Sequence, residues 1–319
     1  PRVLELFTPV IFANSKIMSF FGNKFNIKLQ FNGITDASEA IEGKINVVNV
    51  WKENVKISFG EENKTIGGYA IQSLKAATQA LIKEDIDTLV TAPIHKNSIQ
   101  SDEFNFPEHT DYLAQELKGD SLMFIVSDTI KVELLTDHVP VKDVSSKITE
   151  ELIEKKVNAI HDSLKKDFNI REPKIAVLGI NPHSGDGGVI GEEDDEVLKP
   201  TIKKFIEEGK FVFGPYAADS FFGSKNNANF DAVIAAYHDQ GLIPFKTLSF
   251  GNGVNFTAGL NRIRTSPDHG TAFDIAGKGI AEGSSFTQAI FMSISIFKNR
   301  LEYLELNKSP LEKQTQKSF

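Results

Sequence analysis

Short runs of β-branched and aromatic residues alternate with longer amphipathic segments along most of this chain. The predicted strands are Pro9–Ala13, Ile45–Val50, Thr88–Thr91, Ser121–Val126, Val132–Leu135, Lys174–Ile180 and Ala232–Ala236. The predicted helices, which repeat apolar residues at helical spacing, are Gly68–Glu84, Ile148–Phe168 and Phe286–Phe297. Strands separated by helices of this length typically form crossover units around a largely parallel sheet, so the sequence predicts an α/β fold.

Composition narrows the classes of function. The 319 residues, 40% hydrophobic and 24% charged, suffice for one large or two medium domains. No cysteine is present, so any metal must be held by His, Asp or Glu. The net charge of -8, without a long basic cluster, gives no surface for nucleic acid or an anionic membrane. No apolar run reaches the roughly 20 residues that span a bilayer. We therefore expect a cytoplasmic protein whose partners are small molecules.

Three histidines come directly after predicted strands. His138 follows the strand Val132–Leu135, His183 follows Lys174–Ile180 and His238 follows Ala232–Ala236, each in a context of Gly, Pro or Asp. The carboxyl ends of parallel strands meet at one edge of a sheet, and three histidines with open positions are a typical ligand set for a catalytic metal. The sequence therefore predicts a divalent-metal site, although each histidine taken alone is also compatible with a hydrogen-bonded turn.

Polar residues in the later part of the chain suggest an anion site. Lys246, Asn255 and Arg264 lie along Gly241–Thr265, where glycines permit tight turns and the charges have no helical register. Arg264 is suited to binding a carboxylate or phosphate through two hydrogen bonds, and Lys246 would act as a point charge. We expect one or more of them to face a ligand; ordinary surface positions are the alternative.

Further residues are predicted to lie near the same edge. Thr110, after His109, is a candidate cap for a helix whose amino end receives phosphate, although capping alone also explains it. Asp239 and Asp268 each adjoin a histidine and are candidates for orienting it or for transferring protons.

The glycine-rich segment 185–191 resembles a dinucleotide fingerprint, but its spacing is one residue too long. A loop that lets the backbone approach a ligand is at least as good an interpretation. No other segment supplies a fingerprint after a first strand, so the sequence does not predict a standard Rossmann cofactor site.

These motifs together resemble the 4-hydroxythreonine-4-phosphate dehydrogenase family, and the similarity runs from about Pro9 to Lys298. The matching stretches are Thr91–Lys96, His109–Asp111, Thr136–Pro140, Asn181–His183, Tyr237–Gly241 and Arg264–Thr271. The resemblance implies that His138, His183 and His238 bind the metal. It also implies that His109, Thr110, Lys246, Asn255 and Arg264 contact the substrate.

The family resemblance further implies a fold like that of isocitrate and isopropylmalate dehydrogenases, with two α/β domains around a cleft. We expect a discontinuous first domain, about 1–110 plus 245–319, and a second domain, about 111–244. The charged segment Lys142–Asp167 is predicted to be one long helix linking the two halves. A homodimer is expected to complete each active site. The family begins with a strand, a loop and a helix that this chain lacks, so we expect a truncated chain.

The expected activity is NAD-dependent and divalent-metal-dependent oxidative decarboxylation of 4-phosphohydroxy-L-threonine to 3-amino-2-oxopropyl phosphate in the biosynthesis of pyridoxal 5'-phosphate. Zinc, magnesium and cobalt are the candidate metals. Lys246, Asp239 and Asp268 are the candidates for proton transfer. Four alternatives stay open: a dehydrogenase of a four-carbon phosphorylated sugar acid, a dehydrogenase of an aromatic cis-dihydrodiol, a phosphate acyltransferase, and a non-catalytic binding protein.

Overall fold

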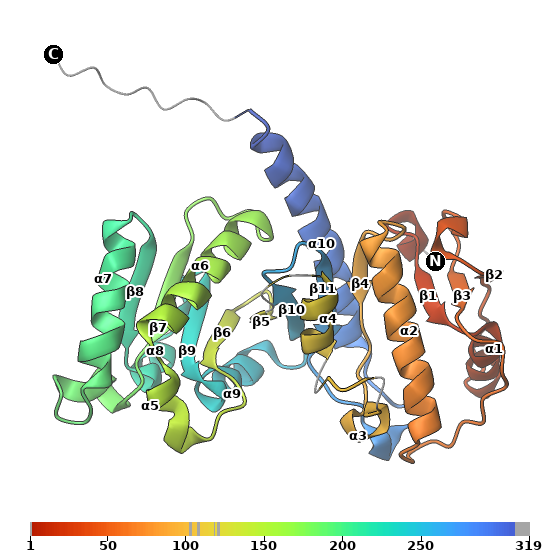
Figure 1. Ribbon diagram of the computed structural model, residues 1–319, viewed down its shortest axis with the longest axis horizontal. Coiled ribbons are helices and arrows are strands. Elements are labelled where there is room, and N and C mark those ends of the chain that lie inside the picture. Colours follow the sequence, from red (N-terminus) through yellow and green to blue (C-terminus); the bar gives the residue numbers. More distant parts are fainter. Residues whose placement is uncertain (1, 102–103, 107–108, 118, 120–121, 310–319) are drawn as a thin grey trace.

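Helices and strands alternate along the chain and build two β-sheets that lie side by side (Figure 1). The computed structural model describes residues 2–101, 104–106, 109–117, 119 and 122–309. The smaller sheet has three parallel strands in the order β1-β3-β2. These strands are β1 (Val10–Ala13), β2 (Asn32–Ile34) and β3 (Asn46–Asn49).

The larger sheet has eight strands in the order β4-β11-β10-β5-β6-β9-β7-β8. They are β4 (Thr88–Val90), β5 (Leu122–Val126), β6 (Lys131–Thr136), β7 (Lys174–Leu178), β8 (Phe211–Tyr216), β9 (Ala232–Tyr237), β10 (Val254–Ala258) and β11 (Ile263–Pro267). Pairing is parallel from β6 through β9 and β7 to β8, and again between β11 and β4. The central strands β11, β10, β5 and β6 pair antiparallel, so they join two parallel parts into one sheet.

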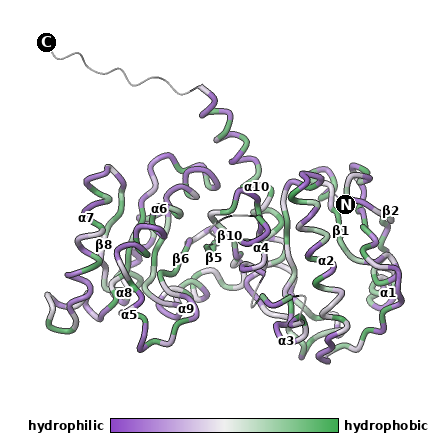
Figure 2. Tube along the Cα trace, in the orientation of Figure 1, coloured by the Kyte–Doolittle hydropathy of each residue, from purple (hydrophilic) through white to green (hydrophobic). Residues whose placement is uncertain are grey.

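Helices cover the sheets. They are α1 (Ser15–Lys24), α2 (Lys64–Ile82), α3 (Lys96–Ile99), α4 (His109–Leu117), α5 (Val144–Lys147), α6 (Glu150–Lys166), α7 (Lys199–Glu207), α8 (Ala218–Gly223), α9 (His238–Ser249) and α10 (Ser284–Leu306). Hydrophobic residues gather on the strands, whereas hydrophilic ones dominate outer helices such as α7 (Figure 2). Within the described residues, no helix combines the length and the hydropathy needed to cross a bilayer.

Helix α6 shows how the sequence pattern produces this packing. Its residues Ile153, Val157, Ile160 and Leu164 recur at helical spacing and are fully buried against the large sheet. Thr149 caps the helix, because its side chain accepts a hydrogen bond from the backbone N–H of Leu152.

The predicted strands are confirmed, with ends shifted by one or two residues; Ser121 lies outside the described residues. The predicted long helix Lys142–Asp167 is wrong. Helix α5 ends at Lys147, the backbone of Ile148 is extended, and α6 begins at Glu150 after its capping residue Thr149. The irregular segment expected over Gly241–Thr265 is also wrong: it contains most of α9, all of β10 and the start of β11. The polar residues Lys246, Asn255 and Arg264 lie on α9, β10 and β11, respectively.

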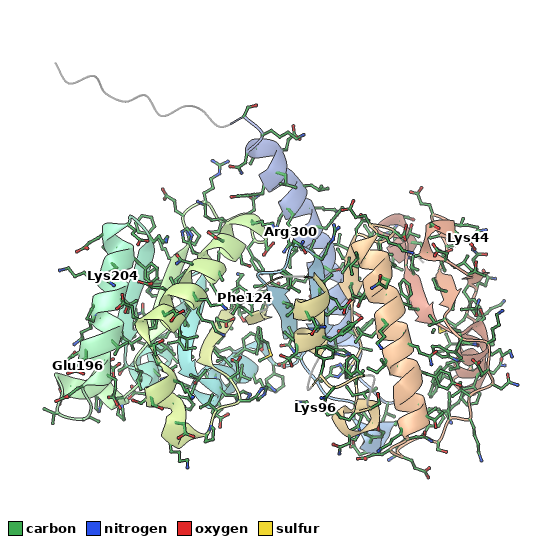
Figure 3. All side chains as sticks on the ribbon, in the orientation of Figure 1. Lys44, Lys96, Phe124, Glu196, Lys204 and Arg300 are labelled. Carbon is green, nitrogen blue, oxygen red and sulfur yellow. The ribbon has the colours of Figure 1, made fainter. Side chains whose placement is uncertain are left out.

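A buried arginine joins helix α10 to the body of the protein. Figure 3 shows Arg300 on α10 beside the centre of the molecule. Its Nε donates to Asp167 Oδ1 at 2.6 Å, and its other nitrogens donate to the carbonyl oxygens of Asn261 and Leu260 at 3.1 and 3.2 Å. The guanidinium therefore ties α10 to the end of α6 and to the turn between β10 and β11.

A second buried ion pair lies beneath the strand that leads to His138. Glu133 on β6 is fully buried, and Lys156 Nζ on α6 lies 2.6 Å from its Oε1. Burial raises the pKa of Glu133 to about 7, against the opposing effect of Lys156. Because the charges compensate each other where water is excluded, removing one partner leaves the other without its counter-charge.

We therefore expect Lys156→Met to lower the free energy of unfolding by about 3–5 kcal/mol. The matched control is Lys203→Met, which breaks the exposed pair between Lys203 and Glu207 and should cost about 0–1 kcal/mol. Urea denaturation of the two variants measures both values. Equal losses in the two variants would contradict the importance of the buried pair.

Candidate functional site

Three histidine-bearing segments leave the large sheet at one edge. Strands β6, β9 and β7 are parallel neighbours, so their carboxyl ends point the same way. His138 lies just after β6, His183 lies in the turn after β7, and His238 is the first residue of α9 after β9. We call this edge, with its three histidines, the histidine edge. The sheet order therefore places these three strand ends at one edge, as predicted.

His138 and His238 are neighbours on the histidine edge. Their ring centroids lie 6.1 Å apart, a separation that one ion bound to a nitrogen of each ring can span. His238 Nδ1 lies 2.8 Å from Asp239 Oδ1, and a carboxylate accepts, so the imidazole donates there and keeps Nε2 free as a ligand. The donor set therefore fits a divalent cation, with Asp239 orienting His238.

His183 projects from a turn with unusual backbone geometry. His183, Ser184 and Asp186 have positive φ, as do Gly185 and Gly187, so a run of left-handed residues carries the imidazole outward. Gly185 is required, because a Cβ there would lie 2.4 Å from the carbonyl oxygen of Gly191. Among the residues that the structure describes, no three His, Cys, Asp or Glu side chains gather into a group able to hold a metal. A single chain thus does not bring all three histidines into one shell.

The first half of α9 packs closely on the sheet, and its second half carries Lys246. A Cβ on Gly241 would lie 2.7 Å from Leu134 Cδ2, so only glycine lets the helix approach β6 this closely. Lys246 Nζ lies 3.8 Å from Asp268 Oδ1. Burial raises the pKa of Asp268, and the nearby positive charges of Lys246, His269 and His238 oppose that shift. Lys246 and Asp268 therefore form an ion pair at the edge of the site.

Arg264 forms the centre of a second, positively charged part of the site. It is buried on β11, where its Nε and Nη2 donate to Thr91 Oγ1 at 3.0 and 2.7 Å and its Nη1 donates to Thr257 Oγ1 at 3.2 Å. Nη2 also lies 3.5 Å from Nδ1 of His109. Burial, and secondarily the charge of Arg264, lowers the pKa of His109 to about 3, so this imidazole is neutral near pH 7.

Two further features lie beside the guanidinium. Thr257, which pairs across from Arg264, shares a face of β10 with Asn255 because side chains alternate along a strand. Asn255 Oδ1 is buried without a hydrogen-bond partner among the described residues, so it is able to accept a hydrogen bond from a ligand. Helix α4 begins at His109 and so directs its positive amino end toward this region. Thr110 is in the first turn, not at the capping position that the sequence suggested.

The sequence profile described as pyridoxal phosphate biosynthetic protein PdxA matches residues 5–293. The chain belongs to this family. A relative named 4-hydroxythreonine-4-phosphate dehydrogenase from Bacteroides thetaiotaomicron is 44% identical over 98% of this chain and 87% of its own length. The family expected from the sequence motifs is thereby confirmed.

Solved structures agree. A crystal structure of 4-hydroxythreonine-4-phosphate dehydrogenase from Klebsiella pneumoniae has a TM-score of 0.79 at 29% identity, covering 90% of this chain and 88% of that one. The enzyme of the same name from Burkholderia phymatum has a TM-score of 0.77 at 33% identity, covering 92% and 90%. Membership of the PdxA family favours a dehydrogenase over the phosphate acyltransferase considered above.

A hollow of about 570 Å³ lies next to the PdxA-family motif that contains Asp268. It is lined by His269–Ala272 and Ile275–Gly277 together with Phe25, Ile27, Pro93, Gly279 and Ala281. The glycine-rich segment 185–191, considered as a dinucleotide fingerprint, does not line it. Sequence reasoning also missed Thr91 and Thr257, whose hydroxyls hold Arg264. Thr91 belongs to a recognised motif, but nothing local marks Thr257.

The pKa of His109 predicts how stability depends on pH. The unfolded chain protonates this imidazole near its ordinary pKa of 6.5, whereas the folded chain does not until about 3. Between these values the unfolded state binds more protons, so His109 makes stability fall as pH decreases from 6.5 toward 3. His109→Asn should flatten this part of the curve of unfolding free energy against pH. His269→Asn, a change at an exposed histidine, is the control, and an unaltered slope in His109→Asn would contradict the assignment.

Proposed function

We propose that this protein is a 4-hydroxythreonine-4-phosphate dehydrogenase that oxidises and decarboxylates 4-phosphohydroxy-L-threonine with NAD and a divalent metal. The observation that carries the proposal is the pairing of two chemically different parts in one PdxA-family chain. The histidine edge offers imidazole nitrogens as ligands for a cation, and the Arg264 region offers positive groups for an anion. A phosphorylated hydroxy amino acid needs both.

The Arg264 region would bind the phosphate. The guanidinium is held by Thr91 and Thr257, so little side-chain freedom is lost when an anion binds. The amino end of α4 adds backbone N–H groups, and neutral His109 adds no positive charge of its own. Asn255 would accept a hydrogen bond from the substrate at its unpartnered oxygen.

His138, His183 and His238 would hold the metal, with His183 brought to the other two by the partner subunit of a dimer or by movement of its loop. When bound there, a divalent cation lowers the pKa of a substrate hydroxyl and stabilises the negative charge that develops during decarboxylation. Zinc, cobalt and magnesium are all candidates, since three imidazoles do not select one of them alone.

The chemistry converts the secondary hydroxyl into a ketone by loss of a proton and a hydride, and NAD is the hydride acceptor. The product is a β-keto acid, whose carboxylate leaves as carbon dioxide, with a proton returned to the carbon it occupied. In this chain Lys246 and Asp268, 3.8 Å apart, would accept and return protons, while Asp239 would hold the His238 ring in orientation. The final product is 3-amino-2-oxopropyl phosphate.

NAD would occupy the hollow beside Asp268. Its volume of about 570 Å³ lies within the range of small-molecule sites, and the run of glycines along its wall lets the backbone approach a ligand. His269 lines the hollow and directly follows Asp268, so a cofactor there would lie near the proposed proton-transfer pair.

The direct test is NADH formation from 4-phosphohydroxy-L-threonine, with Zn²⁺, Co²⁺ or Mg²⁺ added and with chelator. We expect chelator-sensitive reduction of NAD by the wild-type protein and loss of at least about a hundredfold in His238→Ala, since losing a ligand removes the metal's contribution to the transition state. His161→Ala, a histidine on α6 away from the site, should keep its activity. Full activity in His238→Ala would contradict the metal assignment, and no turnover of this substrate by the wild type would contradict the proposed activity.

We further propose a homodimer formed through α9. Ile243 and Leu248 on this helix and Phe250 just after it are exposed apolar side chains, with Phe250 90% and Ile243 63% accessible. The same helix begins with His238, so a partner subunit that covers these residues would lie beside the histidine edge. That position lets the partner complete the metal site.

Phe250→Asp combined with Ile243→Asp should convert the dimer to a monomer, because two charges would be buried without partners in the interface. Light scattering after gel filtration should give twice the chain mass of 35.3 kDa for the wild type and the single mass for the variant. Ile206→Asp, at an exposed apolar residue of α7, should stay dimeric. A wild-type protein that is monomeric, or a double variant that stays dimeric, would contradict the interface.

A further inference from the structure

The large sheet splits just before it reaches the histidine edge. On one side of β9, pairing with β6 continues to Thr136 and Tyr237. On the other side, pairing of β9 with β7 stops earlier, at Val177 and Ile234. Strand β7 stays with β8 instead, and the N–H of Gly179 donates to the carbonyl oxygen of Tyr216 at 2.8 Å. The last residues of β7 and β9 therefore diverge and leave a gap between their backbones.

The side-chain amide of Gln240 bridges this gap. Its Oε1 accepts from the backbone N–H of Ala236 at 2.6 Å, and its Nε2 donates to the carbonyl oxygen of Gly179 at 2.7 Å. A carboxamide offers the same donor and acceptor as a peptide unit, so Gln240 supplies the bonds that the two strands no longer make with each other. Its side chain thus sets the distance between the two strand ends.

Both ends of this bridge lead directly to histidines. Ala236 lies shortly before His238, and Gly179 lies shortly before His183. The third strand end is joined to the same network, because Thr136 Oγ1 donates to the carbonyl oxygen of Ala236 at 2.8 Å. One continuous series of hydrogen bonds therefore connects the three segments of the histidine edge.

The segment that receives the Gln240 bond is itself fixed. The buried carboxylate of Asp194 accepts from the backbone N–H groups of Ile180 and Asn181 at 2.9 and 3.0 Å. A Cβ on Gly179 would lie 2.8 Å from Asp194 Oδ1, so the backbone lies close against this carboxylate. Asp194 therefore holds the turn that carries His183 together, and the bond from Gln240 to Gly179 joins that turn to α9.

We propose that Gln240 is a positioning residue for the divalent cation, fixing the turn of His183 relative to the start of α9. The proposal rests on the metal-dependent function proposed above. In a twofold dimer Gln240 would fix the turn of His183 within each subunit, because both of its hydrogen bonds are made inside one chain. Gln240 contacts the backbone of both segments and need not touch the cation.

The test measures binding of Co²⁺ alone, by titration of the full-length protein and by the visible absorption of the bound ion. Gln240→Met keeps the length of the side chain and removes both hydrogen bonds. We expect a dissociation constant raised 10- to 100-fold and an altered absorption spectrum, as for other residues that orient metal ligands. Gln240→Glu, which keeps the acceptor for Ala236 but turns a carboxylate oxygen toward Gly179, should weaken binding as well.

The matched control is Asn299→Leu. Asn299 Nδ2 donates to the carbonyl oxygen of Asp167 at 2.7 Å, a side-chain-to-backbone bond of the same kind between α10 and the end of α6. Weak Co²⁺ binding in the Gln240 variants with wild-type binding in Asn299→Leu would support the proposal. Wild-type binding in both Gln240 variants, or equal weakening in all three variants, would overturn it. A wild-type protein that binds no Co²⁺ would overturn the proposed metal site and this inference with it.

Discussion

Parallel pairing of β6, β9 and β7 is the constraint on which the histidine edge depends. These strands are far apart in the sequence, yet each buries nearly all of its residues in the two hydrophobic clusters on either face of the sheet, and the parallel arrangement makes all three end at one edge. The order places β9 in the middle, so His238 starts its helix between the segments that carry His138 and His183. The loops at this edge are then free to carry chemistry, because the strands beneath them are held by burial and by a continuous ladder.

The candidate site has two parts, one with groups suited to binding a cation and one with groups suited to binding an anion. The histidine edge presents imidazole nitrogens, whereas the buried guanidinium of Arg264 and the amino end of α4 present positive charge. Burial keeps His109 neutral beside that guanidinium, so two cations do not compete for the same space. Helix α9 connects the environments, since it begins at His238 and carries Lys246 to within 3.8 Å of Asp268. A substrate bearing both a phosphate and a metal-binding hydroxyl fits such an arrangement.

The local sequence pattern was sufficient to predict some elements of the fold, and it gave wrong predictions for others. Strands such as β9 are short, continuous apolar runs, a pattern that is typical of parallel strands buried on both faces. The segment Gly241–Thr265 misled because the buried strands β10 and β11 carry the polar side chains of Asn255 and Arg264, and only the tertiary neighbours of these side chains make their burial favourable. Thr110 misled for a related reason: α4 begins at His109, two residues before the first helical position that a cap at Thr110 would give.

The sequence by itself determined the α/β class and the family, because periodicity and short motifs are properties of neighbouring residues. Only the tertiary structure decided which strands are adjacent, that β7 and β9 part before the edge, and that Gln240 fills the gap between Ala236 and Gly179. Only the structure, likewise, showed that Thr257 holds Arg264. Each of these contacts depends on which strands are neighbours in the sheet. No local pattern in the chain shows that order.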